Sequence, residues 1–275
     1  MPRNPKIKFD TTKIYFGKPY TIDLDDSVGS ITVYSPTIGD IIEMGEERFF
    51  QTLNIFITNT TQYRLDLWDA GIDWTEISDF DLFVFFYKRI DPEPAKLLFG
   101  DLDFSKFEIM YKKIDNEETE SEDIEESKGE VALYDRENKI EINYNVYNHI
   151  SQYLQNVFGI FPEEKITKSQ HLKQMYIEKD RRERKNKEWK EEHNKEEARP
   201  TLQSTISACV NHPGFKYKLK ELEEVGVAEF YDSVRRLMTY EQSTALMKGM
   251  YSGFVDGSKI KPKDYDFMRD MYDNK

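Results

Sequence analysis

The segment from Ile31 to Gly100 constrains the fold most, because an extended stretch is followed by apolar residues at helical spacing. Thr37 and Asp40 have the spacing of a capping box, so we expect a helix to begin there. Apolar residues then recur every three or four positions, which places them on one buried face of a helix. They are Ile38, Ile41, Ile42, Gly45, Phe49, Leu53 and Phe56, with Glu43, Glu46, Glu47 and Arg48 on the solvent side.

The second half of this segment predicts two more helical elements. A short helix around residues 62–70 should stop at Gly71, and Ser78 with Asp81 forms a second capping-box pattern. The run from Phe80 to Tyr87 has almost no polar face, so we expect it to be covered on most sides. It is too short to cross a bilayer, and Asp91–Pro94 should end it.

Two regions have the alternation and turn signals of β-structure. Residues 6–34 predict an extended N-terminal arm or small sheet that packs on its own domain; an arm lying on a neighbouring subunit is the alternative. Residues 131–134 and 139–142 flank a turn at 135–138, which predicts a hairpin. The segment 101–111 reads as a strand that pairs with this hairpin.

Charge patterning sets the expectations for the middle of the chain. Residues 115–127 are rich in acids and offer little to bury, which predicts a disordered loop. Asn143 or Asn145 should cap a core helix that ends at Gly159. Residues 179–199 carry nearly balanced charges, which favours a solvated helix or a mobile connector.

The last third predicts a helix that ends at Asn211, an apolar helical stripe from Leu222 to Leu237, and a turn at 251–254. The predicted class is α+β and predominantly α-helical, with a small antiparallel β element (the N-terminal strands and a hairpin near 131–142) packed on a helical core. The predicted divisions are an N-terminal arm at 1–34, a main helical domain at 35–160, a charged helix or linker at 161–199 and a C-terminal helical subdomain at 200–275.

Composition excludes several classes of function. The net charge of −13 argues against a broad nucleic-acid surface, since phosphate binding needs clustered Lys and Arg. Cys209 is the only cysteine, which excludes an internal disulfide and a cysteine-rich zinc site and fits a reducing compartment. The first residues lack the apolar stretch of a signal peptide, and no apolar run has membrane length, so we expect a cytoplasmic protein without membrane contacts.

No motif predicts catalysis, a metal or a cofactor, and we expect a protein that is not an enzyme. Glu137-Asn138-Lys139 is an acid-x-lysine triplet of the kind that metal-dependent nucleases use, which keeps a nuclease as a distant alternative. It falls in the predicted hairpin turn, however. Acid-x-acid pairs read as turns or helix starts, and Cys209 as a small buried apolar residue. The acid pairs are Asp23/Asp25, Asp79/Asp81, Asp101/Asp103 and Asp264/Asp266.

The histidines predict no metal site, because His149, His171, His193 and His212 are widely spaced, and His149 reads as a helix-surface residue. Three basic pairs, Arg181-Arg182, Arg184-Lys185 and Arg235-Arg236, predict solvated helix faces or, alternatively, a patch for an acidic partner such as residues 115–127. The 17 Tyr and 18 Phe imply that some aromatic rings lie on the surface, where they favour protein contacts over catalysis.

Several segments together resemble proteins encoded among the tail genes of bacteriophages that infect Gram-positive bacteria. The segments are 35–46; 68–74 with 98–104; 206–211 through 215–217 to 230–236; and 251–256. They are hydrophobic and turn signatures that together span most of the chain.

This resemblance implies a tail assembly chaperone, which keeps the tape-measure protein soluble in the host cytoplasm while tube subunits polymerise. The implied partners are phage structural proteins, the tape-measure protein or the tail tube, and self-association stays open. A structural virion protein, such as a tail or connector subunit, is the alternative. The family has no catalytic residues to carry over, and the resemblance assigns no partner-binding residue.

Overall fold

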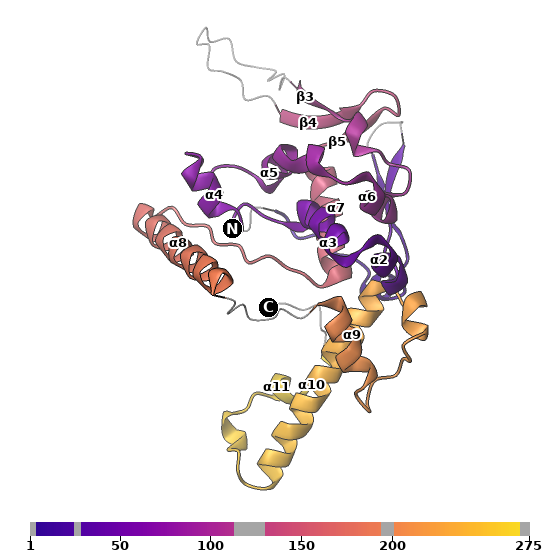
Figure 1. Ribbon diagram of the computed structural model, residues 1–275, viewed down its shortest axis with the longest axis vertical. Helices are drawn as coiled ribbons and strands as arrows, with labels where there is room; N and C mark the ends of the chain where they lie inside the picture. Colours follow the sequence, from indigo (N-terminus) through magenta and orange to yellow (C-terminus); the bar gives the residue numbers. More distant parts are fainter. Residues whose placement is uncertain (1–3, 25–28, 113–129, 194–200, 270–275) are drawn as a thin grey trace.

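A computed structural model describes residues 4–24, 29–112, 130–193 and 201–269. The fold is predominantly helical α+β with two small antiparallel sheets, as predicted (Figure 1). The helices are α1 (Thr11–Tyr15), α2 (Ile38–Met44), α3 (Glu46–Ile57), α4 (Arg64–Asp69), α5 (Asp79–Phe86), α6 (Pro92–Phe99), α7 (Tyr144–Phe158), α8 (Gln170–Glu192), α9 (Leu202–Val210), α10 (Val227–Tyr251) and α11 (Pro262–Tyr265). The strands are β1 (Tyr20–Asp23), β2 (Ser30–Val33), β3 (Glu108–Lys112), β4 (Glu130–Asp135) and β5 (Ile140–Ile142).

Both predicted capping boxes are present. In α2 the Asp40 amide donates to Thr37 Oγ1 at 3.1 Å, and the Thr37 amide donates to Asp40 Oδ2 at 2.7 Å. Ser78 and Asp81 make the same reciprocal pair at the start of α5, at 3.0 and 2.7 Å. Such caps are worth about 1 kcal/mol each, because they satisfy amides that have no partner within the helix.

The helix expected from residue 38 to residue 56 is two helices. Gly45 has φ 91°, outside the helical region, so α2 ends there and α3 begins at Glu46. Ile38 and Ile41 are buried, but Ile42 is 53% exposed, which corrects its predicted place on the buried face. Ile42 lies 100° from Ile41 around the helix, at the edge of the face that packs into the core, and here that edge is open to solvent.

The main core lies between α3 and α7. Phe49, Leu53 and Phe56 of α3 are fully buried, and Leu154 and Val157 of α7 face them within one cluster of buried residues. The α7 helix is capped and terminated as predicted: Asn143 Oδ1 accepts from the Val146 amide at 3.0 Å, and Gly159 ends the helix in the left-handed region.

The apolar run at the start of α5 is covered on most of its faces but not on all. Phe80, Leu82 and Phe83 are buried, whereas Phe85 is 60% exposed. The predicted end at Asp91–Pro94 is also the start of the next helix, because Asp91 Oδ1 accepts from the Glu93 amide and Pro92 occupies the first turn of α6.

The N-terminal segment packs on its own chain. The β1 and β2 strands pair antiparallel, with Tyr20 opposite Val33, and Ile14 and Ile31 are buried in the main core. The predicted hairpin is formed by β4 and β5, and β3 pairs with β4 as expected. The strand predicted from residue 101 begins only at Glu108, because Asp103 caps a single 3-10 turn first. The acid-rich segment 115–127 lies outside the described residues.

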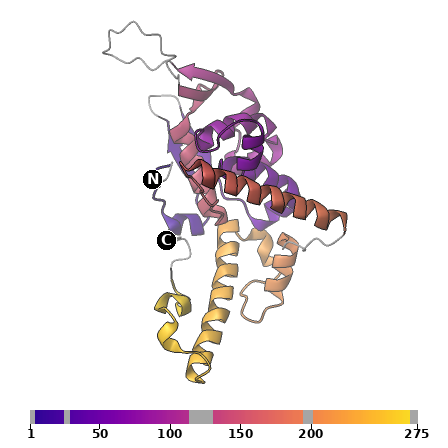
Figure 2. The same ribbon diagram turned by 90° about the vertical axis from the view of Figure 1, so that its left-hand side faces the viewer.

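The α8 helix lies against α4 with one face and is otherwise exposed (Figure 2). Ile177 is buried in a second apolar cluster with Trp74. The predicted charged helix is therefore attached to the body by specific contacts from Lys173 to Arg184, and the helix continues to Glu192. Residues 194–199 lie outside the described part. Four ion pairs hold it: Arg64–Asp180, Lys173–Asp73, Arg181–Asp69 and Arg184–Asp66.

The last third is helical, as expected, and it extends away from the body (Figures 1 and 2). The α9 helix ends at Asn211 and the long α10 helix is followed by a turn at Ser252–Phe254, as predicted. Within the described residues, no helix has both the length and the apolar character needed to span a membrane. The predicted domain boundaries stay a prediction.

Candidate interaction surface

Residues 201–269, which we call the C-terminal arm, project from the rest of the described chain, which we call the body. The α10 helix belongs to the arm and connects it to the body. At its first turns Val227, Ala228 and Phe230 are buried in the main core, against α7 and α1. The helix has 25 residues and is therefore about 37 Å long, so its second half lies clear of the body (Figure 2). One helix thus serves both as a core element and as the support of the arm.

The end of the arm exposes large aromatic rings. Tyr251 is 84% exposed and Phe254 is 91% exposed, the highest values among the large apolar residues that the structure describes as exposed. Gly253 has φ 75° and reverses the chain between these two residues. The tight reversal keeps both rings at the tip, away from the buried face of α10.

The returning chain packs on one side of α10. The Phe267 ring meets Tyr240 edge-on at 5.4 Å, and Arg236 Nη1 donates to the backbone oxygens of Phe267 and Arg269 at 2.8 and 2.6 Å. Thr239 and Ser243 are buried on this side. The arm therefore has an ordered internal structure in which one face of α10 is covered by its own chain.

A groove of about 890 Å³ lies on the other side of α10, between that helix and α9. Its floor is apolar and its edges are polar. Cys209 is buried in it, as predicted for a small apolar residue, and burial raises the pKa of its thiol. Met238 is 58% exposed. The lining residues are Thr201, Ser204, Thr205, Ala208, Cys209, His212, Val234, Leu237, Met238, Glu241 and Gln242.

One carboxylate and one imidazole stand at an edge of this groove. His212 Nε2 lies 3.6 Å from Glu241 Oε1, and His212 Nδ1 accepts a hydrogen bond from the Gly214 amide at 3.0 Å. That hydrogen bond places the proton of the neutral ring on Nε2, toward Glu241. The pair gives the groove a polar, negatively charged edge beside an apolar floor.

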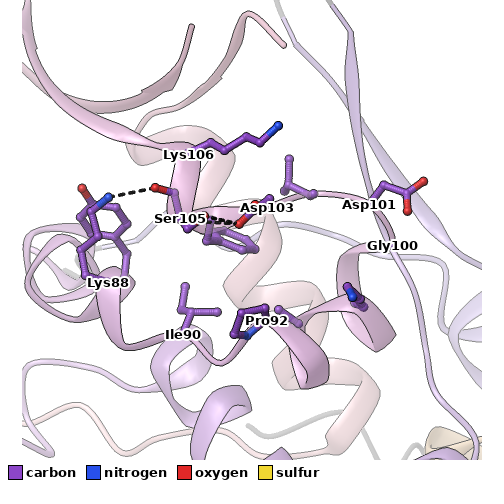
Figure 3. Close-up of a pocket in the computed structure, with 13 residues that line it drawn as sticks. Lys88, Ile90, Pro92, Gly100, Asp101, Asp103, Ser105 and Lys106 are labelled. Atoms are coloured by element: carbon purple, nitrogen blue, oxygen red, sulfur yellow. Dashed lines mark hydrogen bonds between the residues drawn. The ribbon is translucent and has the colours of Figure 1, made fainter. Parts of the chain in front are cut away.

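A second hollow, of about 630 Å³, lies beside α6 and the loop at residues 100–106 (Figure 3). Its charged groups bond within the fold. Lys88 Nζ donates to the backbone oxygens of Ser105 and Phe107 at 3.2 and 2.9 Å, and Asp103 Oδ1 accepts from the Ser105 amide. Figure 3 shows the Lys106 side chain directed away from the apolar side of the hollow. These hydrogen bonds hold the loop in shape. Among the described lining residues, they do not place a nucleophile beside a base.

The acid-x-lysine triplet lies in the β4–β5 turn, as predicted. Glu137 Oε2 accepts from Lys106 Nζ at 2.5 Å, and Lys139 has φ 55°. Asp135 shapes the turn by accepting from the Glu137 and Asn138 amides. Within the described residues, no group of three or more acidic, His or Cys side chains is arranged to hold a metal ion.

The acid-x-acid pairs have local roles where they are described. Asp79 is buried and accepts from the Thr60 amide at 2.8 Å, while Asp81 completes the α5 cap. Asp103 caps a 3-10 turn, and Asp266 accepts from the Met268 amide. The contacts of Asp81, Asp103 and Asp266 fit a turn or a helix start, whereas the Asp79 side chain also ties the start of α5 to Thr60 and Asn4. Asp25 and the Asp264 side chain lie outside the description.

The histidines do not come together. His149 is half-buried rather than on the open helix surface: its Nδ1 lies 2.6 Å from Tyr20 Oη, and burial lowers its pKa. This environment arises because β1 lies over α7 and covers that face. His193 stacks on Trp189 at the end of α8, His171 is exposed on α8, and His212 is in the groove.

The basic pairs do not form one patch either. Arg181 and Arg184 are ion-paired with acids of α4, while Arg236 bonds to the returning chain of the arm. Their elements are separated in space (Figure 1). The alternative of a joint patch for an acidic partner is therefore not supported by the described residues.

The groove and the exposed tip of the arm were not predicted from the sequence. Val234 and Leu237 were placed on an apolar stripe; Val234 does pack against the main core, and both residues also line the groove. Met238 was not singled out, and Tyr251 and Phe254 entered only through the predicted turn and the 251–256 segment of the phage resemblance. One feature of the sequence could have indicated this surface. On a helical wheel of α10 the apolar residues lie on two opposite sides, whereas a helix that packs against one partner needs only one apolar side.

A family model described as YomV second domain matches residues 190–272. No match was found among curated proteins, and none among solved structures. The matched segment includes the end of α8 and all of the described arm, so the similarity falls on the part of the chain that carries the groove and the exposed tip. The match supports a protein of bacteriophage origin.

Proposed function

We propose that this chain is a non-enzymatic bacteriophage morphogenesis factor that binds another phage protein through its C-terminal arm. One observation carries the proposal: Tyr251 and Phe254 stand 84% and 91% exposed at the end of a projecting helix, within the segment that matches the YomV second domain. Exposed aromatic rings in a cluster are typical of protein-binding surfaces, because their burial supplies much of the binding energy.

The finer form of the proposal is a tail assembly chaperone that binds the tape-measure protein in the host cytoplasm. Its support is the resemblance of segments such as 35–46 and 230–236 to tail-gene proteins, together with the phage family match. A structural tail or connector subunit would use the same arm for a permanent contact. The two differ in whether the chain stays in the finished particle.

The first experiment compares purified virions with the infected-cell lysate by mass spectrometry. A chaperone is expected to be abundant in the lysate and absent from particles. Stoichiometric presence in particles would contradict the chaperone hypothesis and support a structural subunit.

The second experiment tests the arm directly by co-expression with the tape-measure protein of the same phage. Wild-type chain should form a soluble complex, and the double variant Tyr251→Ser/Phe254→Ser should lose it. Phe16→Ser is the matched control, because Phe16 is 69% exposed on the body, far along the chain from the arm. An unchanged complex in the tip variant, or no complex with the wild type, contradicts the proposal.

The nuclease alternative predicts a different result. Magnesium-dependent cleavage of DNA by the purified chain that disappears in Glu137→Ala would support it over a binding protein. Its only observation is the triplet in the β4–β5 turn, where Glu137 is already engaged by Lys106.

A further inference from the structure

We infer that the groove between α9 and α10 is a docking site for one amphipathic helix of the partner, with apolar anchor residues and a flanking Lys or Arg. This inference rests on the proposed function and specifies the chemistry of the partner. It places specific recognition in the groove and leaves the aromatic tip as an additional contact.

The dimensions of the groove suit a single helix. Its lining on α10 runs from Val234 to Gln242, which is about 12 Å or two helical turns. A helix laid in such a groove presents anchors at positions i, i+3, i+4 and i+7, which fall within the same two turns.

The floor of the groove matches apolar anchors. Val234, Leu237 and Cys209 provide small and medium apolar surfaces, and Met238 stands 58% exposed beside them. Methionine is flexible and polarizable, so it adapts to the side chains of a bound helix. Burial of this surface by an anchor residue removes apolar area from water and supplies the driving force.

The charge of the groove selects the sign of the flanking residue. Among the described residues that line it, Glu241 is the one whose side chain carries a charge when His212 is neutral. The chain as a whole has a net charge of −13. An approaching helix with Lys or Arg is therefore attracted by both the local carboxylate and the overall field, and a helix with Glu is repelled by both.

A second copy of this chain fits the groove less well. A stable interface between two proteins buries about 800 Å² of each partner. The groove is lined only by short stretches of α9 and α10 and is therefore a small surface for pairing two copies of the chain. Symmetric pairing of two grooves would also bring one Glu241 toward the other, which is unfavourable. A single helix of a partner avoids both problems.

The test uses a fluorine label attached to Met238→Cys in a Cys209→Ala background, which leaves one thiol in the chain. The matched control is Met247→Cys in the same background, because Met247 is 38% exposed on another side of α10. The probes are two synthetic helical peptides of equal length. Both carry Leu at positions i, i+3 and i+7, and they differ in having Lys or Glu at the flanking positions.

We expect the Lys peptide to bind the unlabelled wild-type chain about tenfold more tightly than the Glu peptide. In the labelled chains it should shift the fluorine resonance at residue 238, while the label at residue 247 stays unchanged. Glu241→Lys should reverse the preference. Equal binding of the two peptides, no binding of either peptide, or equal responses at residues 238 and 247 would overturn the inference.

The groove and the proposed function can fail separately. If the Lys peptide binds as described but the tape-measure protein forms no complex, the groove stands and the assigned partner is wrong. If the tape-measure complex forms and survives unchanged in Met238→Lys, the groove inference fails while the proposed function stands. Because Met238 is largely exposed, this variant is expected to fold.

Discussion

The two ends of α10 have similar apolar side chains in opposite environments. At the body end Phe230 is fully buried in the main core, whereas at the arm end Phe254, just beyond the helix, is 91% exposed. The difference shows that the body completes its core without the arm tip. We therefore expect the apolar surface at the tip to contribute little to stability, which fits the partner contact that we propose for it.

The largest expected effect belongs to the body end. Phe230→Ala should lower the free energy of unfolding by about 3–5 kcal/mol, because it removes a large buried ring and leaves a cavity. Urea unfolding followed by tryptophan fluorescence measures it, since Trp68 and Trp74 lie in the body. A loss below about 1 kcal/mol would mean that this end of α10 is not part of the cooperative core.

A second prediction concerns the attachment of α8, which depends on ion pairs rather than on a large apolar face. Lys173 and Asp73 are 5% and 15% exposed and pair at 2.5 Å. Asp73→Ala should cost about 2–4 kcal/mol, because it leaves a buried ammonium without its partner. Asp66→Ala is the control: its pair with Arg184 is 58% and 46% exposed, and its loss should cost less than about 1 kcal/mol.

The same carboxylate predicts a pH dependence. Burial raises the pKa of Asp73, but hydrogen bonds from Lys173 and Thr75 outweigh burial and lower it below the ordinary value. The folded pKa is then below the unfolded one, so the stabilisation is fully present above about pH 4 and is lost as pH falls through the folded value. The stability difference between wild type and Asp73→Asn should therefore shrink below about pH 4, and a constant difference would contradict this assignment.

The junction between body and arm should show an intermediate effect. Gly159 has φ 63°, and a Cβ at this position would collide with the Arg235 guanidinium of α10. Gly159→Ala should cost about 1–2 kcal/mol from the backbone alone. In a double-mutant cycle with Arg235→Ala, part of any further cost should disappear, whereas strict additivity would show that the two residues are not coupled.

The smallest effect on stability belongs to the tip. Phe254→Ala should change the free energy of unfolding by less than about 0.5 kcal/mol, because the ring is already in water. The same variant should weaken the complex with the partner. A loss of stability as large as that of Phe230→Ala would remove the contrast between the two ends of α10.

The candidate surface was the hardest part to predict. We expected aromatic residues on the surface and favoured protein contacts, but the apolar stripe that includes Val234 and Leu237 did not indicate an open groove. Val234 packs against the main core and, with Leu237, also lines that groove. Their spacing is that of any amphipathic helix, and the pattern is the same whether the chain itself or a partner covers that face. In the structure the returning segment at Phe267 covers one side of α10 and leaves the side toward α9 as a groove.

Local chemistry determined much of this protein without reference to the fold. The caps at Thr37 and Ser78, the helix end at Gly159 and the β4–β5 hairpin all depend on groups within a few residues of one another, so the sequence predicts them directly. Tertiary structure decided the rest: which of Ile41 and Ile42 faces the core, how α8 is attached to α4, and which side of α10 stays open. Those outcomes depend on side chains far apart in the chain, such as Lys173 and Asp73. The free energy gained or lost by burying a side chain depends on which groups surround it in the folded structure, so a local sequence pattern cannot give it.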